Sequence, residues 1–143
     1  MLLTIEKALI LKSVKIFSSV PEAQLADLAT ITDSVEFDAG ELILRKGDLG
    51  NSMYIVATGK VRISDGNKEL GLLDSRTVFG ELAALDPEPR AANVEALEDC
   101  VLLRLDGDAL YELMSGNREV TRGIIQVLCE YARHNLTLAR ETN

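Results

Sequence analysis

The segment FGELAALDPEPRAANV, residues 79–94, decides how this sequence is interpreted. Pro87 and Pro89 rule out one continuous helix, because proline removes a backbone donor and clashes with the preceding helical turn. ELAAL has high helix propensity, which predicts one or two helical turns that stop before Pro87. Arg90 then stands alone between a proline and Ala91, where little side-chain bulk would screen its charge. The segment therefore predicts a short helix followed by an arginine that is open to an anion.

The residue types around this arginine suit a small anionic ligand that carries a hydroxyl group. A helix N-terminus offers free backbone N–H groups and the positive end of a dipole, and Gly80 allows close approach of the backbone. Arg90 supplies a planar fork that matches phosphate oxygens, and Glu81 is an acceptor suited to a hydroxyl such as that of a ribose. Three small residues keep the floor of the site low: Ala83, Ala91 and Ala92. The alternative is that Glu81 and Arg90 form a surface ion pair over a proline-rich turn. Composition and periodicity leave that alternative open.

The hydrophobic pattern changes twice along the chain. Residues 3 to about 32 have helical spacing, with an apolar stripe on one face. From about Val35 to Asp106, short apolar runs such as MYIV, VRI and VLLRL alternate with turn sequences such as KGDLGN, TGK and SDGNK. This alternation is typical of an antiparallel sandwich or barrel. The helical period returns after Asp106, so the sequence predicts helices, then a β-structure, then helices within one domain.

Residues 118 to about 140 predict a long final helix with an apolar seam. The seam repeats at a spacing of four and three residues and consists of Val120, Ile124, Val127, Tyr131, His134 and Leu138. Such a seam normally packs on the body of a domain, and we expect it to lie against the β-structure. The alternative is that its outer part pairs with a second copy or with a partner domain.

The composition limits the classes of protein. The 143 residues are 47% hydrophobic and 27% charged, as in an ordinary globular domain. A formal net charge of -8 argues against a nucleic-acid surface, which needs clustered Lys and Arg. No run approaches the roughly 18 apolar residues of a membrane span, and the N-terminus lacks the cleavage site of a signal peptide. Cys100 and Cys129 lie far apart in apolar stretches and indicate buried free thiols in a reducing compartment. We therefore expect a cytoplasmic protein without nucleic-acid binding or membrane insertion.

Two segments resemble one known family. FGELAALDPEPRAANV is similar to the phosphate-binding cassette of the cyclic nucleotide-binding domain family, the cAMP and cGMP sensors. KGDLGNSMYIVATGKVRI, residues 46–63, resembles the family's other marker, a Gly-Asp-x-Gly turn that leads into a strand and a glycine-ended hairpin. The resemblance covers roughly residues 17–115. It implies a mainly β fold with flanking helices, namely an eight-stranded antiparallel, jelly-roll-like β-roll. In this interpretation residues 1–143 are one domain, with N-terminal helices in 1–34, the β-roll in 35–106, the cassette in 79–94 and C-terminal helices in 107–143.

The resemblance also assigns roles within the cassette. It implies that Glu81 binds the ribose 2′-hydroxyl and that Arg90 binds the exocyclic phosphate oxygens. The backbone amides of Ala83 and Ala91 would complete the phosphate site, with Gly80 helping at the ribose. The expected ligand-binding residues are Gly80, Glu81, Leu82, Ala83, Arg90, Ala91 and Ala92. In this family a Thr directly after the arginine is associated with cGMP, so Ala91 favours cAMP. The family's C-terminal helices move when the ligand binds, and Tyr131 is a candidate to cover the base.

The cassette departs from the family pattern at several positions. Asn93 stands where Thr or Ser is usual, Ala84 where a larger aliphatic residue is expected, and Arg76 at a turn position that often holds Gly. Asp86 and Glu88 add two acids near the expected phosphate. Each would cost about 1 to 4 kcal/mol if it faced that phosphate at ~4 Å.

These observations lead to one function and one alternative. The leading interpretation is a non-catalytic cyclic nucleotide sensor that binds cAMP, with cGMP as a second ligand. We expect no cofactor and no metal, since His134 is the only histidine and no catalytic arrangement of side chains stands out. The alternative is a degenerate roll that serves as a dimerisation or scaffold domain without ligand. The expected partners are the nucleotide and, through the final helix, a second copy or a larger partner protein.

Overall fold

The N-terminal part of the chain is helical, as the sequence predicts. The computed structural model describes residues 2–142. Its first elements are α1 (Thr4–Ser13), the short 3-10 helix η1 (Lys15–Phe17) and α2 (Glu22–Ile31). Pro21 is the N-cap of α2, where its missing N–H costs nothing because the first donors of a helix have no intrahelical acceptor.

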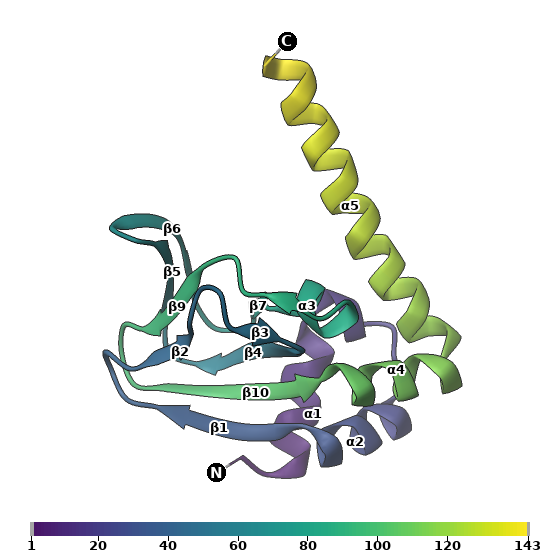
Figure 1. Ribbon diagram of the computed structural model, residues 1–143. Helices are drawn as coiled ribbons and strands as arrows, with labels where there is room; N and C mark the ends of the chain where they lie inside the picture. Colours follow the sequence, from purple (N-terminus) through teal and green to yellow (C-terminus); the bar gives the residue numbers. More distant parts are fainter. Residues whose placement is uncertain (1, 143) are drawn as a thin grey trace.

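Ten strands follow in the described chain, interrupted by one short helix (Figure 1). The strands are β1 (Asp33–Phe37), β2 (Leu42–Leu44), β3 (Leu49–Gly50), β4 (Ser52–Thr58), β5 (Val61–Asp65), β6 (Lys68–Leu73), β7 (Val78–Phe79), β8 (Glu88–Pro89), β9 (Asn93–Ala96) and β10 (Cys100–Asp106). The short helix α3 (Glu81–Leu85) lies between β7 and β8. Two helices, α4 (Gly107–Gly116) and α5 (Arg118–Thr142), complete the order of helices, β-structure and helices.

The strands form two four-stranded antiparallel sheets and one small ladder. The sheets have the orders β1-β10-β4-β7 and β2-β9-β5-β6, and β3 pairs with β8. The mainly β fold with flanking helices is confirmed, but the expected count of eight strands is wrong. The structure has ten, because Leu49 and Gly50 pair with Pro89 and Glu88 in an additional ladder of two-residue strands. This ladder joins the loop before β4 to the cassette.

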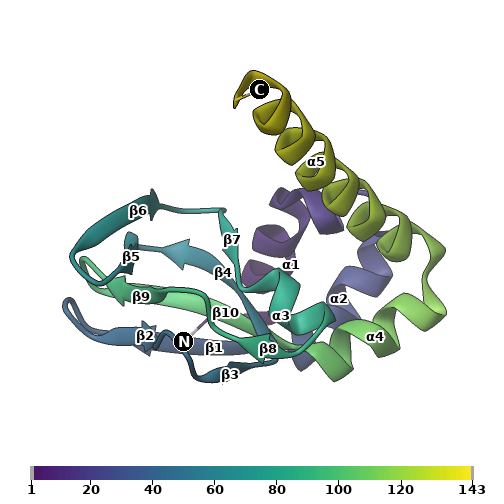
Figure 2. The same ribbon diagram turned by 45° about the horizontal axis from the view of Figure 1, so that its top comes forward.

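Strand β4 is buried on both faces, which explains its continuous apolar sequence. Met53 and Ile55 belong to the core cluster shared with the helices, whereas Tyr54 and Val56 belong to the cluster between the two sheets. Successive side chains of a strand point to opposite faces, so one strand serves both cores. The helices α1 and α2 cover one side of the first sheet (Figure 2). The opposite side is left for the interior of the roll.

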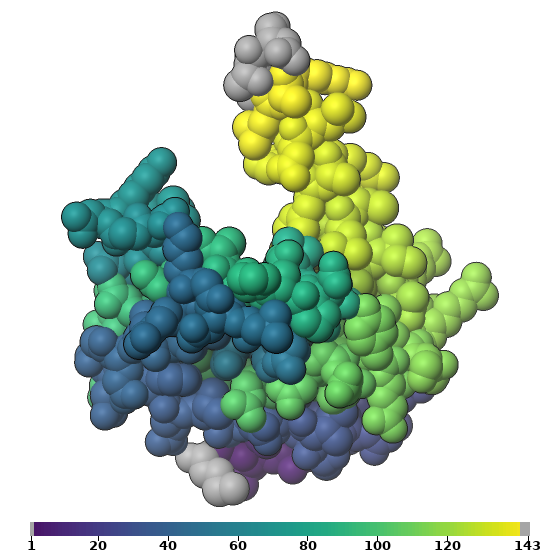
Figure 3. Space-filling view, viewed as in Figure 1, coloured from purple at the N-terminus to yellow at the C-terminus, as the bar shows by residue number. Residues whose placement is uncertain are grey.

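Helix α5 leaves the body of the molecule after its inner part. Val120 and Ile124 are buried, and Val127 packs against the helical core cluster. Every residue in the range 128–140 is exposed, and this part projects from the domain in Figures 1 and 3. The expectation that the seam packs on the β-structure is therefore wrong: its inner part packs on η1 and α4, and its outer members, Tyr131, His134 and Leu138, are exposed. A straight helix anchored at one end on η1 and α4 diverges from the rounded body, so its outer side chains have little to pack against. Neither α5 nor any other helix within residues 2–142 is apolar and long enough to cross a bilayer.

Candidate functional site

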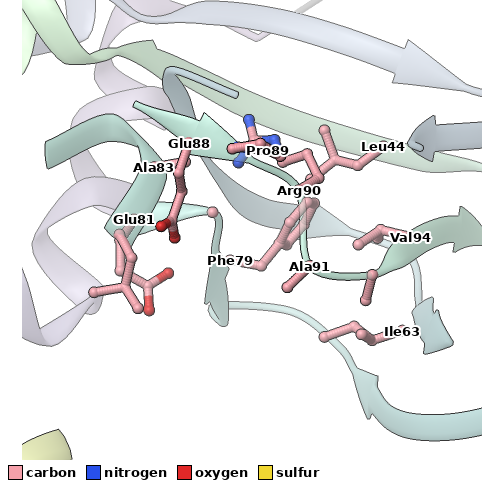
Figure 4. A pocket seen from close by; sticks show the side chains of 13 residues that line it. Leu44, Ile63, Phe79, Glu81, Ala83, Glu88, Pro89, Arg90, Ala91 and Val94 are labelled. Carbon is pink, nitrogen blue, oxygen red and sulfur yellow. The ribbon is translucent and has the colours of Figure 1, made fainter. Parts of the chain in front are cut away.

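The cassette forms one wall of a pocket of about 210 Å³. All seven residues that the sequence predicts as ligand-binding line it, in two segments, 80–83 and 90–92. The remaining lining residues are Leu44, Ile63, Phe79, Glu88, Pro89 and Val94 (Figure 4). In the whole molecule the cassette lies at the floor of a hollow between the β5–β6 hairpin and α5 (Figure 3). The structure thus brings all the expected residues together at one place.

Arg90 is held at the edge of this pocket through its backbone and its side chain. Its backbone N–H donates to the carbonyl of Asp48 at 2.8 Å, and its carbonyl accepts from the N–H of Gly47 at 2.9 Å. Its Nη2 donates to the backbone carbonyl of Ser52 at 2.9 Å. Burial lowers the pKa of Arg90, a shift that Tyr54 opposes, but an arginine stays charged at neutral pH. The site therefore contains a partly buried cation tied to the loop before β4.

Two glycines make room for the guanidinium. A Cβ at Gly50 would lie 2.2 Å from Nε and 2.4 Å from Cζ of Arg90, and a Cβ at Gly80 would lie 2.8 Å from Nη1. Gly80 also has a φ of 79°, which glycine adopts without strain, as the N-cap of α3. The side chain of Arg90 runs away from Ala91 and Ile63 (Figure 4). Its guanidinium consequently lies beside Gly80, the N-cap of α3.

Glu81 and Arg90 have separate partners. Oε1 of Glu81 accepts a hydrogen bond from the hydroxyl of Tyr131 on α5, whereas Arg90 donates to Ser52. The alternative of a surface ion pair between Glu81 and Arg90 is therefore wrong. Burial, and then the adjacent Glu81 carboxylate, raise the pKa of Tyr131, so this hydroxyl stays protonated and can donate.

Sequence reasoning missed two groups of the site, Gly50 and the carbonyl of Ser52. Gly50 lies in the quoted KGDLGN turn and could have been found as a glycine that a neighbouring side chain requires. The carbonyl of Ser52 has no sequence signal, because every residue carries one. Tyr131, the residue expected to cover the base, lies at the site, and its hydroxyl donates to Glu81.

The departures from the family pattern have local explanations. Oδ1 of Asn93 accepts the backbone N–H of Lys46 at 2.7 Å, so Asn93 links the two segments that carry the resemblance. Ala84 is buried in the helical core cluster, where a Cβ at Gly107 would lie 2.2 Å from its carbonyl oxygen. Arg76 has a φ of 71°, a conformation that glycine favours.

The two extra acids differ in position. Glu88 is among the lining residues of the pocket and Asp86 is not. Figure 4 shows the carboxylate of Glu88 on the same side of the pocket as that of Glu81. The Coulomb repulsion between an acid and the expected phosphate therefore applies to Glu88 and not to Asp86.

Comparison with known proteins decides the family. The model of the family described as "Cyclic nucleotide-binding domain" matches residues 34–117. This chain belongs to that family. In the cyclic nucleotide-binding domain described above, the matched residues run from β1 to the end of α4 and include the whole pocket.

Relatives with the same domain differ in their overall function. The chain is 29% identical over 129 residues to a CRP-like cAMP-activated global transcriptional regulator of Mycobacterium tuberculosis, and the match covers 87% of this chain and 58% of that protein. It is 36% identical over 107 residues to a cGMP-dependent protein kinase of Toxoplasma gondii, with 75% of this chain and 11% of the kinase covered. The chain thus spans little more than half of the regulator and a small part of the kinase.

Solved structures of this family superpose closely. The catabolite activator protein of Thermus thermophilus has a TM-score of 0.79 at 27% identity, covering 90% of this chain and 63% of that chain. The regulatory domain of Toxoplasma gondii PKA, solved with cAMP, has a TM-score of 0.70 at 28% identity, covering 77% and 44%. Both values support the same roll with flanking helices.

Proposed function

We propose that this chain is a non-catalytic sensor domain that binds cAMP. The observation that carries the proposal is the position of Arg90, whose guanidinium lies beside Gly80 in the pocket that Glu81 also lines. A cation and a carboxylate on one pocket wall suit a ligand that carries both a phosphate and a hydroxyl. A cyclic nucleotide has both groups.

Each part of the ligand has a matching part of the pocket in this proposal. Arg90 would hold the exocyclic phosphate oxygens, together with the backbone amides of Ala83 and Ala91. Glu81 would accept the ribose 2′-hydroxyl, next to Gly80. The remaining cassette residues, Leu82 and Ala92, would shape the wall, and the apolar residues of β2, β5 and β9 would contact the base: Leu44, Ile63 and Val94.

The preference for cAMP over cGMP rests on one residue. The relatives include a cAMP-activated regulator and a cGMP-dependent kinase, so family membership leaves the base undecided. Ala91, which follows the arginine and lines the pocket, supplies no hydroxyl of the kind associated with cGMP.

The proposal includes a cytoplasmic location and a protein partner. Cys100 and Cys129 are free thiols, which fits the reducing cytoplasm. The expectation that both are buried is wrong for Cys129, which is exposed on α5. The acidic net charge of -8 makes the chain itself a poor surface for nucleic acid. The exposed outer part of α5 would pass the signal to a second copy or to a partner protein.

Titration calorimetry with cAMP, cGMP and AMP tests the ligand. We expect heat for cAMP, weaker binding of cGMP and none of AMP. No measurable heat of binding for any of the three nucleotides would favour the degenerate roll, a dimerisation or scaffold domain without ligand.

Substitution of Arg90 tests the site. Arg90→Ala removes charge-assisted bonds worth about 2 to 5 kcal/mol in total, so the affinity for cAMP should fall at least about tenfold. Unfolding of the protein alone should change by only about 1 kcal/mol, from the lost bond to Ser52. Arg45→Ala is the matched control, because it removes the same charge from an exposed residue outside the pocket. An unchanged Kd in Arg90→Ala would eliminate the site assignment.

A further inference from the structure

The hydrogen bond between Tyr131 and Glu81 joins two parts of the chain that are 50 residues apart in sequence. Tyr131 lies on the outer part of α5, within the range 128–140 whose residues are exposed. Glu81 is the first residue of α3 and lines the pocket. Within the described residues, this bond ties the projecting helix to the cassette.

The hydrogen bond from Tyr131 to Glu81 is charge-assisted, because its acceptor is a carboxylate. A hydrogen bond to a charged carboxylate contributes more than a bond between neutral groups, and Tyr131 is partly buried, with 41% of its surface exposed. Nearby, the outer helix makes an ion pair from Glu130 to Lys15 of η1, but both partners of that pair are solvated, and such pairs contribute little. Tyr131 is thus the main polar anchor of this part of α5 on the cassette.

We infer that Tyr131 competes with a hydroxyl of the ligand for Glu81, so that α5 docking and ligand binding oppose each other. The inference rests on the proposed function, because it takes Glu81 as the acceptor of the ribose 2′-hydroxyl. A phenol and a ribose hydroxyl are both O–H donors, and each needs the same carboxylate at the pocket wall. A ligand that claims Glu81 breaks the bond that holds α5. By reciprocity, a contact that draws α5 away raises the affinity for the ligand by the same factor.

The test removes only the hydroxyl. Tyr131→Phe keeps the ring and deletes the competing donor, so the affinity for cAMP should rise about three- to tenfold. The affinity for 2′-deoxy-cAMP should not change, since that ligand has no 2′-hydroxyl and leaves the Tyr131 bond in place. In a Glu81→Ala background, Tyr131→Phe should bring no gain, as a double-mutant cycle requires of two coupled groups.

A second tyrosine supplies the matched control. The hydroxyl of Tyr111 on α4 donates to the carbonyl of Leu85, the last residue of α3. Tyr111→Phe therefore deletes a phenol that contacts the same short helix without touching Glu81. We expect it to leave the affinities for cAMP and 2′-deoxy-cAMP unchanged.

Hydrogen exchange provides a readout that needs no ligand. Tyr131→Phe alone should speed exchange in the outer part of α5, residues 128–142, relative to the wild-type protein and to Tyr111→Phe. Addition of cAMP to the wild-type protein should produce the same increase in the same residues.

The outcomes separate this inference from the proposed function. Suppose that the wild-type protein binds cAMP and that Tyr131→Phe binds it equally or more weakly. The hydroxyl of Tyr131 then does not compete with the ribose hydroxyl for Glu81, so the inference is wrong while the proposed function stands. An equal gain for cAMP and 2′-deoxy-cAMP would also overturn it, because the competition would not involve the ribose hydroxyl. If only Tyr131→Phe binds cAMP, both stand and Tyr131 blocks the site. If neither protein binds, both proposals fall.

Discussion

At the scale of single residues, the position of the Arg90 side chain requires glycine at position 50, because a Cβ there would overlap it. Gly50 is buried, and its φ lies outside the left-handed region. An alanine could therefore adopt its backbone conformation, and the obstacle is space alone. The atoms in the way are Nε and Cζ of Arg90, in the middle of its side chain, so the whole side chain would have to move.

We therefore predict that Gly50→Ala abolishes most of the binding without unfolding the protein. The Cβ would displace the guanidinium from Gly80 and Ser52, and the affinity for cAMP should fall at least about tenfold, as after loss of a charge-assisted contact. Unfolding in urea should cost about 1 to 3 kcal/mol less, the usual penalty for overpacking. Gly71→Ala is the control, because Gly71 lies in a strand and has nothing within 4 Å of its Cβ position. Full cAMP affinity in Gly50→Ala would show that the position of Arg90 in this structure is not the binding position.

At the scale of elements, α5 is anchored where two backbones approach closely. A Cβ at Gly123 would lie 2.6 Å from the carbonyl oxygen of Ile16 in η1. The helical residues Val120 and Ile124 on either side of this contact are buried. Glycine at position 123 weakens the helix by about 1 kcal/mol relative to alanine. It is nevertheless required, because only a residue without a Cβ lets the inner part of α5 pack this closely on η1.

We predict that Gly123→Ala destabilises the protein although alanine is the better helix former. The clash with a backbone atom should outweigh the gain in propensity and lower the free energy of unfolding by about 1 to 3 kcal/mol. Gly116→Ala, at the end of α4, meets nothing within 4 Å and should be neutral or slightly stabilising. Chemical denaturation of the two variants checks the difference. A more stable Gly123→Ala would mean that α5 docks less closely on η1 than described.

At the scale of the whole molecule, α5 carries large apolar side chains that remain exposed among the described residues 2–142. Ile125, Leu128 and Leu136, which share one face of the helix, are 53%, 37% and 53% exposed. An isolated helix of about 15 residues is marginal in water without packing. The outer part of α5 therefore gains stability if it packs against another helix, and a second copy of the chain offers an identical apolar surface.

We predict a concentration-dependent dimer that forms through this surface. Sedimentation velocity should show a rising dimer fraction for the wild-type chain, whereas the double variant Leu128→Glu with Leu136→Glu should remain a monomer. The control, Gln126→Glu, adds a charge at an exposed position of the same helix and should still dimerise. Because the substitutions lie outside the pocket, the double variant should still bind cAMP. Equal masses for all three proteins would contradict the prediction.

The sequence by itself determined the order of elements, the class of fold and seven of the residues that line the pocket. Period and propensity are local properties, so a run such as MYIVA predicts a buried strand and ELAAL a short helix wherever they occur. The seven cassette residues lie within 13 positions of one another, from Gly80 to Ala92. The turn through Pro87 and Pro89 brings the two ends of this segment close together, so Glu81 and Arg90 line the same pocket.

Only the tertiary structure decided which groups these residues contact. The acceptor for Arg90 is a backbone carbonyl 38 residues away, and the donor to Glu81 is a phenol 50 residues away. Carbonyls carry no residue-specific signal, and contacts at such separations exist only once the two sheets and the last helix have closed around the cassette. The departure of α5 from the body is decided in the same way. A heptad-like seam predicts that a helix has an apolar face, but the anchoring of its inner end on η1 and α4 determines how far that face stays in contact.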